Sequence, residues 1–535
     1  MVLLVRAARC FGWIVFAGSV GAVLVALTVQ LLQGPVAEQT WWPGPRLWRY
    51  FFTSLGIAAG ACFFAMLISL PASLALITAR RGVARSIISA LAILPIITMP
   101  SSHSYAWFLM STSKVAIVSG FMKIVHWNAP GMQPVDAAWV LAAWLWPIPC
   151  LVIAASFRRT GAGTFQLASM DAPPRRAFGS ALSVMRGPVI AAFAGVFCLA
   201  LIDSTIPPLV GANQVWSAEL MAQASAAIKY DRPAAFLFFQ AWPMLAVIAV
   251  LGLIALPGLR QMARWAEPPD EDLGVVRAAA WWPSVVLVGL ISFLPFVVFC
   301  VELSTGRTTA CVAVATAART LWKSGVASMI VALVSALGAV CLAVALIDVE
   351  TRRGALTVLR RIAFALLLVA AVLPPELIGI SLVSVYAKIA GPSDWWSLYD
   401  RSPWPWAMGM VVRFGFLTAC VGRFLVRHPA GELAASATLD GASPIERLVH
   451  ARLPLIRGPL ITAGIMVACL TMSEVAISLL VQPPRFIGGS FAVAVDSQMH
   501  YGRQNETVAG ALMLAIPSML AAGCAAAVTG RRAGK

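Results

Sequence analysis

The sequence is poor in charged residues. Only 11% of its 535 residues are Asp, Glu, Lys or Arg, whereas a soluble protein carries about 25%. Hydrophobic residues make up 60% of the chain, and the mean hydropathy is +0.85. This composition excludes an ordinary soluble globular protein and indicates a polytopic membrane protein.

The familiar motifs of enzymes and metal proteins are also missing. The chain has no G-x-x-x-x-G-K-[ST] phosphate loop, no G-x-S-x-G and no H-E-x-x-H. Its ten cysteines include no C-x-x-C pair, and its five histidines have no metal-ligand spacing. We therefore expect no catalytic residues, no metal site and no cofactor bound by this chain. If ATP drives the protein, a separate subunit must bind it.

Positive charge is concentrated in short loops between apolar runs. The net charge is +17, which by itself would suit nucleic-acid binding, but alternate loops are richer in basic residues, as at Arg80-Arg81, Arg158-Arg159 and Arg352-Arg353. This alternation follows the positive-inside rule. We therefore expect a membrane lipid environment, no nucleic-acid partner and both termini in the cytoplasm.

About twelve apolar runs have the length that a bilayer requires of a helix, near 20 residues. We expect an all-α protein whose spans lie near 11–33, 50–78, 86–110, 136–157, 188–210, 234–257, 280–303, 324–347, 361–387, 405–426, 459–481 and 507–529.

The spans divide into two similar halves. A shift of roughly 271 residues aligns Arg186-Gly187-Pro188 with Arg457-Gly458-Pro459, and Asp203 with Glu474. An even number of spans per copy makes the two six-helix repeats parallel. We predict a first half at 1–265 with its repeat domain at about 50–257. A polar linker at 266–279 follows, and then a second half at 280–535 with its repeat domain at about 324–529.

A polar segment at about 428–457 separates two spans of the second half. It predicts a helix up to Leu439, a turn at Asp440-Gly441 and a second helix. Ser443 is the expected N-cap of that second helix, with Pro444 in its first turn and Glu446 closing a capping box. The second helix is expected to stop at Leu453-Pro454.

This segment resembles the cytoplasmic "EAA" loop of ABC importer permeases, which docks on the ATPase subunit. Gly441-Ala442-Ser443-Pro444 and Leu453-Pro454 match that family's pattern, while its triplet falls on Ala435-Ser436-Ala437 and lacks the glutamate. The resemblance implies that one set of residues couples to the ATPase: Ala435, Ala437, Asp440, Gly441, Ala442, Ser443, Pro444, Glu446 and Pro454.

The repeat predicts a first coupling loop at about 158–185. Asp171 replaces the turn glycine there, Ala172 and Pro174 match Ala442 and Pro444, and Val184-Met185 replaces Leu-Pro. Asp tolerates a left-handed conformation, so a turn at Asp171 is feasible. The alternative interpretation is a solvated linker.

Three acidic residues lie inside apolar spans, where ionisable groups are costly and mark a pathway or a paired partner. Asp203, Glu474 and Glu376 are therefore candidates for a translocation path. The alternative is that Asp203 and Glu474 cap bent helices. Pro374-Pro375 should break the span before Glu376, and Arg413 could pair with one of these acids.

The resemblance extends over both halves and implies the permease subunit of a bacterial ABC importer, with two fused type-1 transmembrane domains, in the inner membrane. Among fused permeases the chain is most similar to the iron(III) type, and thiamine and aminoethylphosphonate permeases share the layout. The family implies a cytoplasmic ABC ATPase dimer that holds ATP, a periplasmic solute-binding protein and transport by alternating access. The alternative is a secondary carrier with parallel six-helix halves, driven by an ion gradient.

Overall fold

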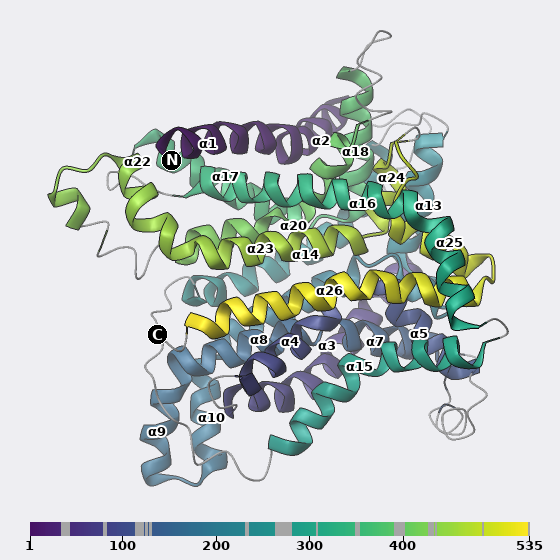
Figure 1. Cartoon of the computed structure of the whole chain (residues 1–535), viewed down its shortest axis with the longest axis horizontal. Helices are drawn as coiled ribbons and strands as arrows, with labels where there is room; N and C mark the ends of the chain where they lie inside the picture. The colour runs from purple at the N-terminus through teal and green to yellow at the C-terminus, as the bar shows by residue number, and fades with distance from the viewer. Residues whose placement is uncertain are drawn as a thin grey trace. The chain divides into compact units, whose positions relative to one another are not determined.

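The computed structural model describes all residues except 34–42, 79–82, 113–121, 123–126, 128–130, 230–234, 263–280, 307–308, 348–353, 390–401, 426–432, 434–435, 484–485 and 533–535. The described residues form helices joined by turns and contain no β-strand (Figure 1). The expected all-α class is confirmed.

Seven helices among the described residues are long and apolar enough to cross a membrane, or up to eleven if each bent pair counts as one span. These correspond to eleven of the twelve expected spans. The remaining expected span, 507–529, is the helix α26 (Gln504–Arg532), which is not among the candidates. The chain is therefore a multi-pass membrane protein, since several of these helices are too long and apolar for a soluble fold.

One compact unit, unit 1, comprises Met1–Gly44, Glu219–Trp242 and Gly306–Pro517. Its centre is the long helix α16 (Ala310–Leu346), which α1, α20 and α23 surround. The other helices that lie wholly in this unit are α1 (Val2–Phe16), α2 (Ala22–Gln33), α17 (Ala355–Ala371), α18 (Pro375–Ile389), α20 (Trp404–Leu425), α22 (Pro444–Glu446), α23 (Leu453–Ser473), α24 (Ala476–Val481) and α25 (Phe491–His500).

The second compact unit, unit 2, comprises Pro45–Ala218, Pro243–Thr305 and Ser518–Lys535. Its centre is α3 (Pro45–Thr78), which packs against α7, α8, α11 and α15. The other helices that lie wholly in this unit are α4 (Val83–Ile97), α5 (Pro100–Thr112), α7 (Gln133–Leu145), α8 (Pro147–Ser156), α9 (Ala162–Asp171), α10 (Pro174–Val184), α11 (Arg186–Leu201), α12 (Ile206–Leu209) and α15 (Trp281–Thr305). The helices α13 (Trp216–Lys229), α14 (Ala235–Met262) and α26 are divided between the units.

The first helix of each predicted half packs within the unit built mainly from the other half. Helices α1 and α2 pack against α16 and α18 in unit 1, whereas α15 packs against α3, α4 and α5 in unit 2. The predicted linker at 266–279 lies outside the described residues. The division of the sequence into halves at that linker stays a prediction.

Each unit contains a sharply broken span at the corresponding place. Helices α17 and α18 meet at 115°, at the predicted break Pro374-Pro375, and α4 and α5 meet at 92° just before Pro100. The expected spans 86–110 and 361–387 are therefore not continuous helices. The break at the proline pair is confirmed. Proline cannot donate to the preceding turn, which explains why both breaks fall there.

A matched pair of serines also supports the internal repeat. In unit 2 the backbone N–H of Trp216 donates to Ser54 Oγ at 2.9 Å, and in unit 1 the backbone N–H of Phe491 donates to Ser328 Oγ at 2.8 Å. Each bond joins the start of a short helix to the central helix of its unit. Because a helix leaves its first N–H groups without intrahelical partners, the serine satisfies a buried donor in both places.

We predict that Ser328→Ala destabilises the protein by about 1–3 kcal/mol, because the buried Phe491 N–H loses its acceptor. Ser304→Ala is the control, since Ser304 is exposed and bonds only the carbonyl of Val301 within its own helix. Thermal unfolding in detergent measures the difference. Equal midpoints for the two variants would contradict the prediction.

Candidate coupling hairpins and capped helix breaks

The turn of the second hairpin is a Schellman motif. Residues 436–439 are helical, and Gly441 follows with φ +78°. The Gly441 N–H donates to Thr438 O at 3.2 Å, and the Ala442 N–H donates to Ala437 O at 2.9 Å. These two bonds satisfy the last carbonyls of the helix. The predicted role of Gly441 as a left-handed helix terminator is confirmed.

The predicted capping box is also present. The Ser443 N–H donates to Glu446 Oε2 at 2.8 Å, and the Glu446 N–H donates to Ser443 Oγ at 3.4 Å, with Pro444 in the first turn. The reciprocal bonds satisfy two donors at the start of the helix. Since Asp440, Gly441, Ser443, Pro444 and Glu446 are all exposed, no other described part of the protein needs to move for a partner to reach this turn.

The sequence predicted that the second helix stops at Leu453-Pro454, and this prediction is wrong. It continues from Pro444 to Ser473 as one helix, through the π-helical segment Arg447–Arg452 and into α23. The wide turns of that segment immediately precede Pro454 and shift the hydrogen-bond pattern. Pro454 therefore lies in the first turn of α23, where a missing N–H is tolerated.

The structure adds a bond between the two arms of this hairpin. Arg447 Nη1 donates to Thr438 Oγ1 at 2.6 Å, so the arms are joined by side chains as well as by the turn. Ala437 and Ala442 are half-buried against this junction, whereas Pro454 is exposed. Ala435, the remaining predicted coupling residue, lies outside the described residues.

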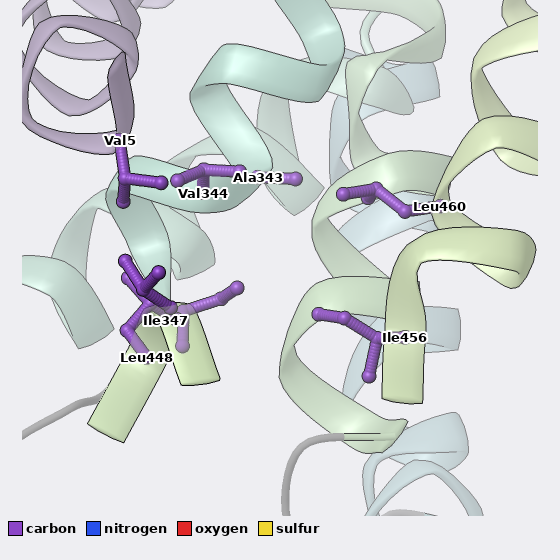
Figure 2. Packing of buried hydrophobic residues seen from close by; sticks show 8 residues of the cluster. Val5, Ala343, Val344, Ile347, Leu448, Ile456 and Leu460 are labelled. Atoms are coloured by element: carbon purple, nitrogen blue, oxygen red, sulfur yellow. The ribbon is translucent and has the colours of Figure 1, made fainter. Parts of the chain in front are cut away.

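The foot of the second hairpin, Leu448 and Val449, is buried in the core of unit 1. Both side chains are fully buried in a cluster with Val5, Ala343, Val344, Ile347, Ile456 and Leu460 (Figure 2). The cluster therefore draws on α1, α16 and α23 besides the hairpin. Burial of apolar surface holds the foot while the turn stays in water.

The first hairpin consists of α9 and α10, which pack against each other at one end of unit 2 (Figure 1). Asp171 is the last residue of α9, and the chain turns through extended backbone at Ala172 and Pro173. The expected left-handed turn at Asp171 is therefore not formed. Pro174 begins α10, as predicted, because its fixed φ suits the first turn of a helix.

An aromatic cluster holds the base of the first hairpin. Phe157 packs against Phe165 and Phe178 with ring centroids 5.8 and 6.0 Å apart. These rings come from the π-helical segment Phe157–Gly161 and from both hairpin helices. Such contacts contribute beyond simple area burial, so this hairpin is stabilised largely by its own residues.

Both hairpins expose large apolar side chains near their turns. Leu439 is 90% exposed in the second hairpin, and Met170 is 80% exposed in the first. Leu433 and Leu167 are exposed beside them. These side chains are available for contact with a partner, although isolated exposed apolar residues are also common on protein surfaces. Sequence reasoning overlooked these side chains, although each stands out as a large apolar residue among polar and small neighbours.

Asp203 and Glu474 cap the short helices that follow them. Asp203 Oδ1 accepts the N–H groups of Thr205 and Ile206 at 3.1 and 2.7 Å. The Glu474 carboxylate accepts those of Ile477 and Ser478 at 2.9 and 3.0 Å. The alternative interpretation of these acids, as caps of bent helices, thus has direct geometric support. Their role in a translocation path stays a prediction.

Arg413 stabilises the break between α17 and α18. Its Nη1 donates to the carbonyls of Ala371 and Leu373, both at 3.1 Å. Glu376 is fully buried in the first turn of α18, which packs against α24. The pairing of Arg413 with one of the acids stays a prediction, and the cation satisfies carbonyls that the broken helix leaves open.

In unit 2 a histidine lies at the break between α4 and α5. His103 Nε2 lies 2.9 Å from Thr98 Oγ1 and 3.1 Å from Pro95 O. Among the residues that the structure describes, no group of three His, Cys, Asp or Glu side chains is placed to hold a metal ion.

We predict that Glu474→Ala lowers stability by about 1–2 kcal/mol, because the N–H groups of Ile477 and Ser478 lose their acceptor. Glu474→Gln keeps an acceptor oxygen and should stay close to the parent protein. Thermal unfolding of both variants beside solute uptake tests this. A Gln variant with parental stability and no uptake would instead assign Glu474 to the translocation path.

Residues 351–533 match the family model described as "Binding-protein-dependent transport system inner membrane component". The matched region contains α17 to α26 and therefore the whole second hairpin. No match was found among curated proteins or among solved structures. The family match supports a transport permease of the ABC class for the second half of the chain.

Proposed function

We propose that this chain is the membrane permease subunit of an ATP-driven ABC importer. In this proposal it carries two fused permease domains and works in a bacterial inner membrane. A cytoplasmic ATPase dimer hydrolyses ATP, and a periplasmic binding protein delivers the solute. The chain itself is not an enzyme.

The second hairpin is the observation that carries the proposal. It has a rigid turn closed by two backbone bonds and a capping box. It has an exposed apolar tip at Leu439, and it has a foot buried in the core of unit 1. A lever that a soluble partner pushes requires these three properties. The hairpin also lies inside the segment that matches the permease family.

The first hairpin supports a second docking point. It lacks the glycine turn, but α9 still exposes Leu167 and Met170 above an aromatic base that both hairpin helices share. Transport by alternating access requires that the ATPase bind the hairpins differently in its two states, because a partner with equal affinity for both would shift nothing.

We propose iron(III) as the solute, on the resemblance of the fused layout. Thiamine and aminoethylphosphonate permeases share that layout, so these two solutes are the natural competitors to test. The second candidate function, a secondary carrier, requires an ion gradient and no ATPase.

We predict that uptake of iron(III) by cells carrying the chain with its ATPase and binding protein stops when ATP is depleted and the ion gradient is kept. Thiamine and aminoethylphosphonate in excess should not compete. Uptake that persisted without ATP would remove the ABC proposal, while ATP-dependent uptake blocked by one competitor would change only the solute.

We predict that Gly441→Pro abolishes transport while the protein still inserts in the membrane. Proline fixes φ near −65° and removes the N–H that bonds Thr438 O. Gly441→Asn is the matched control, because Asn tolerates a left-handed conformation and an added Cβ meets open space there. Normal transport and ATPase binding in the Pro variant would remove the hairpin from its assigned role.

A further inference from the structure

The foot of the second hairpin is covered by α1 as well as by its neighbours in the second half. Val5 of α1 is buried in the same cluster as Leu448 and Val449, and α1 also contacts α22. Figure 2 shows Val5 above Ile347 and Leu448, beside Val344. A residue near the beginning of the sequence thus forms part of the hydrophobic cluster that surrounds the foot of the hairpin.

The position of α1 on unit 1 is closely defined. Gly12 packs so tightly on α16 that an added Cβ would overlap the carbonyl of Cys341. Farther along, the carbonyl of Gly18, in the π-helical segment Ala17–Gly21, accepts the Tyr386 hydroxyl at 2.9 Å. These contacts fix the register of α1 on the unit, and the register determines where Val5 lies.

The first hairpin is seated differently. Besides its aromatic base, its outgoing end is held by α14, where Gln261 Nε2 donates to Val184 O at 3.0 Å and Gly187 packs directly against Gly258. Among the described residues of unit 2, α15, which corresponds to α1 in sequence order, packs chiefly on α3, α4 and α5. The two hairpins therefore rest on different kinds of support.

We propose that α1 is a positioning element of the second hairpin, that Val5 is its positioning residue, and that α1 and the hairpin move together as one body. The inference rests on the proposed function of the hairpin. Close-packed apolar contacts transmit displacement because protein interiors resist compression. The cluster therefore carries a push on the turn into α1 and α16 together, so α1 contributes to coupling although it lies outside the segment that matches the family.

The first test changes Val5 and its exposed neighbour in the same way. Val5→Asn places an amide in the cluster, whereas Leu4→Asn changes a residue that is largely exposed. We expect the Val5→Asn variant to bind the ATPase, and the ATPase to hydrolyse ATP normally. The solute transported per ATP should fall about tenfold, which corresponds to roughly 1.4 kcal/mol of lost packing energy between α1 and the hairpin. Leu4→Asn and the conservative Val5→Ile should behave as the parent.

The second test asks whether α1 moves with the hairpin. The double variant Val5→Cys, Leu448→Cys, in a background with Cys10→Ser and Cys341→Ala, should form a disulfide on oxidation because the two side chains share one cluster. We expect the cross-linked protein to transport at the rate of its reduced form. Where the disulfide forms, loss of transport on oxidation would show the hairpin sliding past α1 and would overturn the inference.

Failure of the inference can be told apart from failure of the proposed function. If the parent protein neither binds an ATPase nor needs ATP, the proposed function itself is wrong. If the parent is driven by ATP but Val5→Asn retains full transport per ATP, only the role of α1 is wrong.

Discussion

Backbone groups that leave a helix inside a membrane must find partners within the protein, because lipid offers none. This constraint governs the described part of the chain wherever a span is broken. Arg413 satisfies the carbonyls of Ala371 and Leu373 after α17, and His103 Nε2 lies near the carbonyl of Pro95 in α4. Asp203 and Glu474 satisfy the first N–H groups of α12 and α24. At these breaks, polar side chains thus supply the partners that regular helices leave missing.

The same constraint explains why ionisable residues in apolar spans are ambiguous when only the sequence is known. A carboxylate at a helix N-terminus offsets unpaired donors and the positive end of the helix dipole, and this alone justifies its cost. A translocation path also runs where helices break, because irregular backbone is tolerated only around a cavity or within protein. Capping and a role in the path are therefore compatible for Glu474, and each affects a different measurable property.

Local patterns in the sequence predicted local structure well. The capping box at Ser443, the left-handed Gly441 and the break at Pro374-Pro375 each depend on a few adjacent residues, and each is present.

Predictions that depended on the surrounding structure were less accurate. Pro454 does not end its helix, because the π-helical segment before it changes the hydrogen-bond pattern. Asp171 does not adopt the left-handed conformation of a turn glycine, because the chain turns through extended backbone at Ala172 instead. The cluster of Val5 with Leu448 joins residues from opposite ends of the sequence, so no periodicity could have indicated it. The one clue in the sequence was the apolar pair Leu448-Val449 within an otherwise polar hairpin, which indicates that this part of the hairpin is buried.

The two hairpins differ in how rigidly each is connected to the span that follows it. The second hairpin is part of a continuous helix that runs from the polar turn into α23, and its foot lies in the core of unit 1. The first meets α11 at a bend of 71°, and a contact between Gly187 and Gly258 flanks that bend. A continuous helix whose base lies in a packed core moves with that core, whereas a bend lets a hairpin change its angle to the span that follows. In the proposed importer, the same push on both hairpins can therefore move the two units in different ways.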